Sequence, residues 1–218
     1  MSKSQISGAF CLLACLQISS ALAQSTAPSP GQAAVPPQPE QPKSADAGRD
    51  CAPLPVVKTG SWVVIDRKGM KRRETVTAVS DERISLRLES LSGFYADNGE
   101  ANFTREWAAF SGPSATNQNV TLSFSPAMNV LKFPMCPGGS HEQKLRWEGQ
   151  QFSGYFTLKS KVAAKEKLAI GGKEFEVFRV EYDTGSQGGV IWYSPELGRP
   201  LKGSTRLTEW IVVEYGGS

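Results

Sequence analysis

The sequence has few of the residues on which enzymes depend. Histidine occurs once among 218 residues, at His141. Nucleophilic catalysis needs a nucleophile, a base within hydrogen-bonding distance and a group that orients the base, and no Gly-x-Ser-x-Gly stretch accompanies this histidine. We interpret His141, in the stretch CPGGSHEQK, as a solvated loop residue. The sequence therefore predicts a non-enzymatic protein with no catalytic residue and no cofactor, and an unrecognised Ser-Lys pair is the remaining enzymatic alternative.

Long apolar runs and a strong charge of one sign are also missing. No segment approaches the roughly 18 uninterrupted apolar residues that a helix needs to cross a bilayer. Lys and Arg number 24 and Asp and Glu 21, which gives a net charge of +3. Proteins that bind nucleic acid usually carry a much stronger basic stripe. We therefore expect no transmembrane span and no nucleic-acid partner.

The N-terminus has the pattern of an export signal. Lys3 is followed by an apolar stretch over 9–16 and by Ala-Leu-Ala at 21–23, which predicts a signal peptide over residues 1–23 and a periplasmic location. A second reading stays open. Leu-Leu-Ala at 12–14 precedes Cys15, the setting in which bacterial lipoproteins are cleaved and lipidated, so the alternative is an outer-membrane lipoprotein anchored through Cys15.

Cysteine is scarce after export. Removal of residues 1–23 leaves only Cys51 and Cys136, and an even pair in an oxidising compartment predicts one disulfide. On the chain-entropy argument it would contribute roughly 4 kcal/mol. Two unpaired buried thiols are the alternative. Two cysteines 85 positions apart with one histidine lack zinc-site spacing, so we expect no metal.

The rest of the chain divides into a linker and one domain. Residues 24–50 contain six prolines among Ser, Ala and Gln, a composition typical of a disordered, semi-extended linker. Residues 51–218 form a single domain, which is long enough to bury a substantial core.

Strand-like alternation dominates this domain. Ile84, Leu86 and Leu88 alternate with polar residues, as in a strand with one wet face. The segment 161–170 is the best candidate for a single short helix, although its flanks are strand-like. The apolar parity flips at Val177–Phe178, which predicts a β-bulge and a bent sheet. Strands are expected near 61–66, 73–80, 82–90, 102–110, 119–124, 128–133, 143–148, 152–160, 162–170, 174–183, 189–194 and 206–215. The expected fold is all-β, a curved antiparallel sheet forming a sandwich or an open half-barrel.

The stretch IWYSPELGRPLK at 191–202 is the most distinctive in the chain. Pro195 presets the backbone for a turn and Gly198 can take the positive φ that completes it, while Pro200 marks an edge or the start of a strand. Of Trp192 and Tyr193, one faces the core and the other the opposite side. Two readings remain: a rigid corner, or a binding site made by the exposed aromatic residue and Arg199.

This corner resembles a terminal signature of an uncharacterised family of bacterial periplasmic all-β proteins. The segments LKFPMCPGGSHEQKLRWEG (131–149) and AIGGKEFEVFRVEY (169–182) are similar to its mid-chain and strand-turn-strand signatures. Met135 replaces a usual Leu, and Cys136 is an addition. The resemblance implies a curved all-β fold and an envelope location, and assigns no activity.

Two hypotheses of function follow. The first is a binding domain whose curved sheet holds a partner or an apolar ligand, because aromatic residues are plentiful; the tryptophans are Trp62, Trp107, Trp147, Trp192 and Trp210. The alternative is a structural accessory subunit, or a lipoprotein, of an envelope complex.

Overall fold

The structure is a computed structural model that describes residues 50–92, 98–111, 122–149, 153–185, 187–206 and 208–217. The chain divides into two compact units, Met1–Lys43 and Ser44–Ser218, and the described residues belong to the second. The predicted signal peptide, Cys15 and nearly all of the predicted linker lie outside the described residues. No helix in the described part of the chain is long and apolar enough to cross a membrane.

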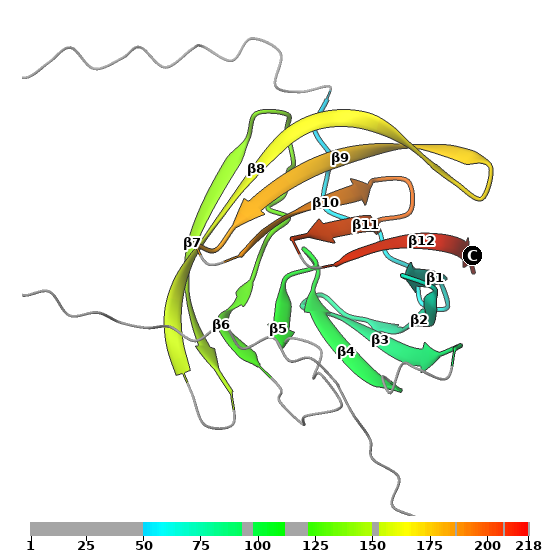
Figure 1. Ribbon diagram of the computed structural model, residues 1–218, viewed down its shortest axis with the longest axis horizontal. Helices are drawn as coiled ribbons and strands as arrows, with labels where there is room; N and C mark the ends of the chain where they lie inside the picture. The colour runs from blue at the N-terminus through cyan, green and yellow to red at the C-terminus, as the bar shows by residue number, and fades with distance from the viewer. Residues whose placement is uncertain are drawn as a thin grey trace, which may run out of the picture. The chain divides into compact units, whose positions relative to one another are not determined.

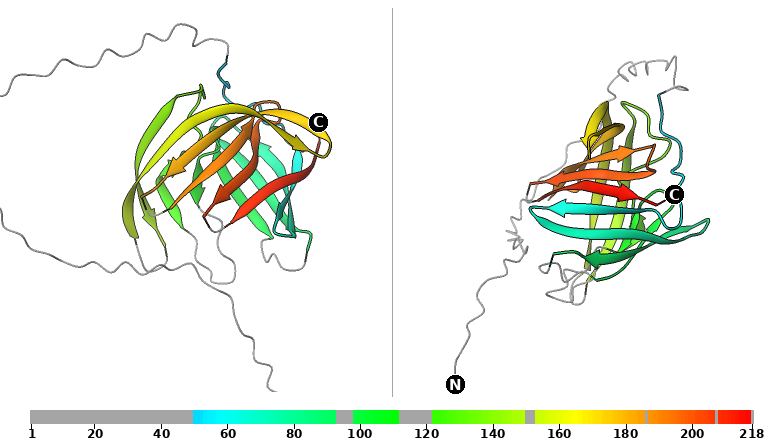
Figure 2. Two further views of the ribbon diagram at one scale, coloured as in Figure 1. Left: turned by 45° about the horizontal axis from the view of Figure 1, so that its top comes forward. Right: turned by 90° about the vertical axis from the view of Figure 1, so that its right-hand side faces the viewer.

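Twelve antiparallel strands form a closed barrel, in which each strand pairs with the next in sequence and β1 pairs with β12 (Figures 1 and 2). The strands are β1 (Trp62–Arg67), β2 (Met70–Val79), β3 (Arg83–Ser90), β4 (Gly99–Thr104), β5 (Ala109–Ser111), β6 (Ser123–Met128), β7 (Ser140–Glu148), β8 (Ser153–Ile170), β9 (Lys173–Asp183), β10 (Gly188–Ser194), β11 (Arg199–Thr205) and β12 (Glu209–Gly216). The all-β prediction is confirmed, and the described residues contain no helix. The prediction of a sandwich or an open half-barrel is wrong, because the pairing of Trp62 with Gly216 and of Ile65 with Val212 closes the sheet.

Several strand boundaries differ from expectation. The segment 128–133 is not a strand beyond Met128, and 153–170 is one long strand rather than two strands or a helix. Strand β11 falls where a corner was expected, with Pro200 as its second residue, which agrees with the reading of Pro200 as a strand start. The single strand expected near 102–110 is instead broken by a tight turn between β4 and β5, which contains Trp107 at a φ of 61°.

The predicted bulge is misplaced. Val177 and Phe178 pair with consecutive residues of β8 without a shift, whereas the register between β8 and β9 shifts between Val162 and Ala164. Val177 and Phe178 are nevertheless both buried, in two different clusters. Successive side chains of a strand point to opposite faces, so both faces of β9 are covered here. The parity flip therefore records a strand buried on both sides, not an inserted residue.

Buried apolar side chains form three clusters. One joins the loop 129–139 and Ala52 to β7–β10, a second joins β1, β11 and β12 to the outer end of the β8–β9 hairpin, and a third lies on β2 and β3. The largest fully buried side chain is that of Tyr193, in the first cluster.

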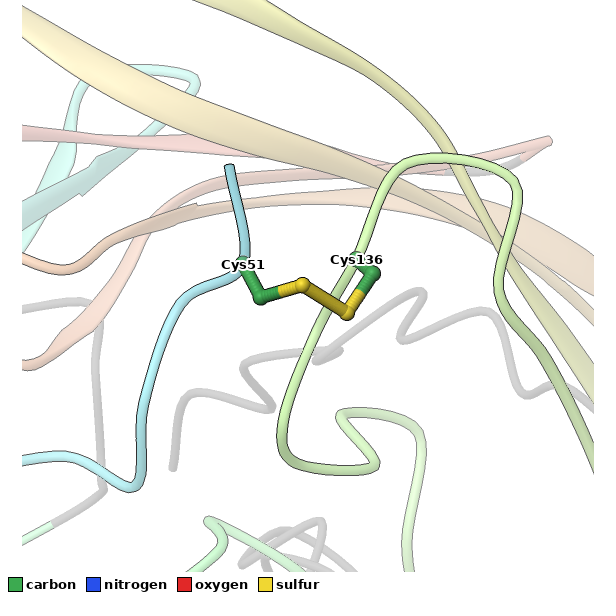
Figure 3. The surroundings of a disulfide bond; sticks show 2 residues. All are labelled: Cys51 and Cys136. Carbon is green, nitrogen blue, oxygen red and sulfur yellow. A yellow bond between two sulfur atoms is a disulfide. The ribbon is translucent and has the colours of Figure 1, made fainter. Parts of the chain in front are cut away.

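The N-terminal strap, residues 50–57, is fastened to the loop 129–139. Ala52 and Met135 exchange two backbone hydrogen bonds, of 2.8 and 3.0 Å. Beside them Cys51 and Cys136 form the predicted disulfide, with their Cα atoms 4.2 Å apart (Figure 3). The strap passes across one end of the barrel before it enters β1 (Figures 1 and 2). The disulfide thus ties the start of the domain to the middle of its chain.

Candidate functional site

The two aromatic residues of the corner have opposite environments. Tyr193 is fully buried, and its ring meets that of Phe133 edge to face at 5.2 Å. Trp192 lies on the other face of β10, where its indole N–H donates to the Glu166 carboxylate and the Lys202 ammonium stacks on the ring at 4.9 Å. Tyr193 is therefore the residue that faces the core.

Arg199 is buried and does not lie beside Trp192. Its Nη2 donates to Glu74 Oε2 at 2.7 Å, and Arg72 bonds the other oxygen of the same carboxylate at 2.6 Å. The guanidinium also lies over the Trp107 ring at 5.3 Å. Burial lowers the pKa of Arg199, and Glu74 opposes that shift. An arginine that is 5% exposed is not available as a surface binding group.

The turn itself is held by neighbours from two other segments. Residues 195–198, including Pro195, form the turn between β10 and β11, and Gly198 has a φ of +63°. The carbonyl of Gly198 accepts a hydrogen bond of 2.7 Å from the Trp107 indole N–H. A Cβ at Gly198 would lie 2.8 Å from the carbonyl oxygen of Val56 in the strap. The geometry favours the reading of a rigid corner over that of a binding site.

His141 is not in a loop, contrary to prediction. It is the second residue of β7, because the turn before it ends at Gly138 and the strand begins at Ser140. Its side chain is half-buried. Its Nε2 is buried and has no hydrogen-bond partner among the described residues. His141 pairs directly with Ser160 on β8, and Ser160 pairs with Tyr182 on β9. These three residues, the polar row, share one face of the sheet.

That face is the core face, which also carries Leu145, Leu158 and Val180. Ser160 is buried and Tyr182 packs against the same apolar cluster. A hollow of about 70 Å³ lies between the polar row and the loop 129–139. Its lining includes Met135, His141, Ser160, Val162 and Val180. The polar row thus borders an apolar interior.

A larger pocket of about 560 Å³ is centred on the same three strands. It is lined by the polar row and by six neighbours, Ser140, Glu142, Lys159, Lys161, Glu181 and Asp183. Strand alternation places these six on the outer face, so the pocket is open to solvent. The three carboxylates already have partners, in Lys159, Arg179 and the Gly185 N–H. Lys161 has no ion-pair partner in the described residues.

The five tryptophans are all half-buried, and three of them carry a cation on the ring. Arg73 lies over Trp62 at 4.6 Å, and Trp192 and Trp107 have Lys202 and Arg199. Within the described ranges, no cation stacks on Trp147 or Trp210. The two tryptophans without a cation also share a position in the fold, since each lies one residue from the end of its strand.

Four aromatic residues share that position and face; we call Phe124, Trp147, Tyr182 and Trp210 the aromatic rim. Each is the second or next-to-last residue of β6, β7, β9 or β12. In an antiparallel barrel these strand ends meet at one end, here the end away from the strap. Phe124 pairs with Trp147, two residues beyond buried Leu145. Pairing continues from Trp210 through Gly203 and Ile191 to buried Val180, so the rim residues lie on the core face.

Glycines let these rings lie against the backbone. A Cβ at Gly154 would lie 2.8 Å from Nε1 of Trp147, and one at Gly203 would lie 2.4 Å from Nε1 of Trp210. A Cβ at Gly189 would lie 2.7 Å from the Tyr182 hydroxyl. The rings therefore occupy the space that side chains would fill, and their remaining surface stays half-exposed at the barrel end.

No three His, Cys, Asp or Glu side chains of the described residues lie close enough to hold a metal ion. No protein-family model matches the chain, and no curated protein matches it. Among solved structures, the chain is similar to the crystal structure of the hypothetical lipoprotein YmcC from Escherichia coli (K12). The sequences are 13% identical, the match covers 73% of this chain and 89% of that one, and the TM-score is 0.46. A similarity of this degree supports no statement about function. The resemblance to a periplasmic family stays a prediction.

Proposed function

We propose that this protein is a non-enzymatic, exported binding protein of the bacterial cell envelope, and that its barrel takes up an apolar ligand at the aromatic rim. One observation carries the proposal. Four aromatic side chains on the core face remain half-exposed at one barrel end, while the same face is fully buried further in, at Leu145, Val180 and Tyr193.

Physical chemistry supports that reading. Aromatic side chains supply large apolar contact areas, and ligand sites are common in the mouths of β-barrels. The closed barrel limits the free strand edge in the described residues to segments such as Ser153–Leu158 of β8 and Lys173–Val177 of β9, which disfavours the accessory-subunit alternative in its sheet-edge form. The disulfide is typical of proteins outside the cytoplasm, and it supports the export part of the proposal.

The test compares tryptophans on the two faces. Trp147→Ala and Trp210→Ala should each weaken binding of the fluorescent probe 1-anilinonaphthalene-8-sulfonate by about fivefold or more. Trp62→Ala is the matched control, because Trp62 also lies on a glycine, Gly216, but on the outer face beneath Arg73. Equal probe affinity in all three variants and in the wild type would refute a site at the rim. Intact mass of the exported protein separates a lipid-anchored form, which keeps residues 16–23 and gains acyl mass on Cys15, from a free one.

A further inference from the structure

We infer that the ligand of the aromatic rim is an amphiphile with a carboxylate head group, and that the polar row of His141, Ser160 and Tyr182 binds this head group. The inference rests on the proposed function and adds the chemistry of the ligand. It starts from the position of the row, because opposed residues on neighbouring strands have Cβ atoms only about 5 Å apart. One small polar group can therefore touch adjacent members of the row.

The row holds unused hydrogen-bonding capacity. Within the described chain, His141 Nε2 is buried and has no hydrogen-bond partner, and its neighbours in the row, Ser160 and Tyr182, carry hydroxyl groups that can also bond a ligand. Buried polar groups in proteins nearly always have a partner. A buried imidazole nitrogen without one, beside Ser160 and a hollow of about 70 Å³, is what a site for an exogenous polar group requires.

The unused groups favour an acceptor. The hydroxyls of Ser160 and Tyr182 can donate, and burial raises the pKa of Tyr182, so that the phenol keeps its proton at neutral pH. The acidic side chains of the neighbouring residues lie on the outer face, paired with Lys159, Arg179 and a backbone N–H, so they add no acceptor to the row on the core face. Hydroxyl donors on the core face suit an anionic oxygen ligand such as a carboxylate.

The apolar part of the ligand follows from the next row of the sheet. Immediately beside the polar row, paired residues on β8–β12 are Val162, Val180, Ile191, Gly203 and Trp210. This line leads from the hollow to the rim. Strands in a barrel are tilted and staggered, so a line of paired residues runs obliquely from the interior to one end. Tyr182 belongs to both the polar row and the aromatic rim, so an amphiphile whose carboxylate lies at the polar row can lay its tail on the half-exposed rim side chains.

The test uses three probes below their micelle concentrations: dodecanoate, dodecan-1-ol with the same tail and no carboxylate, and acetate with no tail. The single histidine makes the imidazole NMR signals of the untagged, exported protein a direct reporter of the polar row. We expect dodecanoate to shift these signals and to bind at least about tenfold more tightly than dodecan-1-ol, and acetate to bind weakly.

Tyr182→Phe should reduce dodecanoate affinity by about tenfold, the effect of one hydrogen bond to a charged group, and should reduce dodecan-1-ol affinity by a smaller factor. Tyr155→Phe is the matched control, since Tyr155 lies on the adjacent strand and is 80% exposed. Equal affinities for dodecanoate and dodecan-1-ol with unmoved imidazole signals would overturn the head-group inference and leave binding at the rim standing. Failure of both long-chain probes to bind would overturn the inference together with the proposed function.

Discussion

The guanidinium of Arg199 lies 2.7 Å from the carboxylate of Glu74, 125 positions earlier in the chain. The pair joins β11 to β2 across β12 and β1, and both residues are less than 10% exposed. Because the bond spans the strands next to the closure of the barrel, it couples the corner at 195–198 to the seam between β1 and β12. We therefore interpret the corner motif as a structural element.

Glu74→Gln should destabilise the protein strongly. The substitution leaves the guanidiniums of Arg72 and Arg199 beside a neutral amide, and removal of one partner of a buried ion pair typically costs about 3–5 kcal/mol. Urea denaturation measures the loss. Glu174→Gln is the control, because its pair with Lys167 is exposed and its removal should leave the midpoint unchanged. Equal effects of the two substitutions would contradict the structural role of the buried pair.

Tyr193→Phe should raise the free energy of unfolding by about 1 kcal/mol, because the buried Tyr193 hydroxyl has no partner in the described residues and an unsatisfied hydroxyl is costly. Tyr155→Phe, at an exposed site, should have no effect. If Tyr193→Phe destabilised the protein by a comparable amount, the hydroxyl would have a partner.

Alkaline pH should lower the free energy of unfolding of the wild type more than that of Tyr193→Phe. Burial raises the pKa of Tyr193, so the folded state retains its proton at a pH where the unfolded chain has lost it. The contribution of Tyr193 to stability is fully present at pH values below about 10, the pKa of tyrosine in the unfolded chain. It is lost as the pH rises above that value. Unfolding curves between pH 8 and 11 should therefore fall more steeply for the wild type than for Tyr193→Phe. Parallel curves would show that the ring is not buried.

Gly198→Ala should lower the free energy of unfolding by about 2 kcal/mol or more. The alanine would need a left-handed backbone, which costs roughly 1–2 kcal/mol, and its Cβ would press on the Val56 carbonyl. Gly172→Ala has the same backbone cost, at a φ of +82°, with nothing within 4 Å of the new Cβ. The difference between the two variants measures the contact of the corner with the strap, and a difference near zero would show that the strap does not pack there.

The paired substitution of Cys51 and Cys136 by serine should cost about 4 kcal/mol, because the disulfide closes a loop across 85 positions and constrains the unfolded chain. Differential scanning calorimetry of the exported protein, with and without reductant, provides the measurement. Titration of two free thiols in the untreated protein would contradict the bridge.

The sequence predicted individual strands better than it predicted the closure of the barrel. Alternation at Ile84, Leu86 and Leu88 correctly indicates β3 and its buried face, because period-two patterning is a property of neighbouring residues. Closure depends on which edge strands meet, and nothing local in β1 or β12 encodes their pairing. The disulfide followed from elimination of the other cysteines.

The candidate site was less accessible to sequence reasoning. Glycines before His141 suggested a loop, yet the strand starts immediately after them. Strand β11 was missed because RPLKGST has a single large apolar residue, Leu201. Which tryptophans face inward depends on pairings such as Trp210 with Gly203. A glycine opposite a tryptophan on the next strand is a signal that could have been read in the sequence once the hairpin was known.

The most direct test of ligand binding is native mass spectrometry of the exported protein, purified from its own cell envelope without detergent. The account predicts a population heavier than the mature chain by the mass of one amphiphile, released by organic extraction and depleted in Trp147→Ala and Trp210→Ala. A single species at the mass of the bare mature chain, unchanged after incubation with dodecanoate, would contradict it.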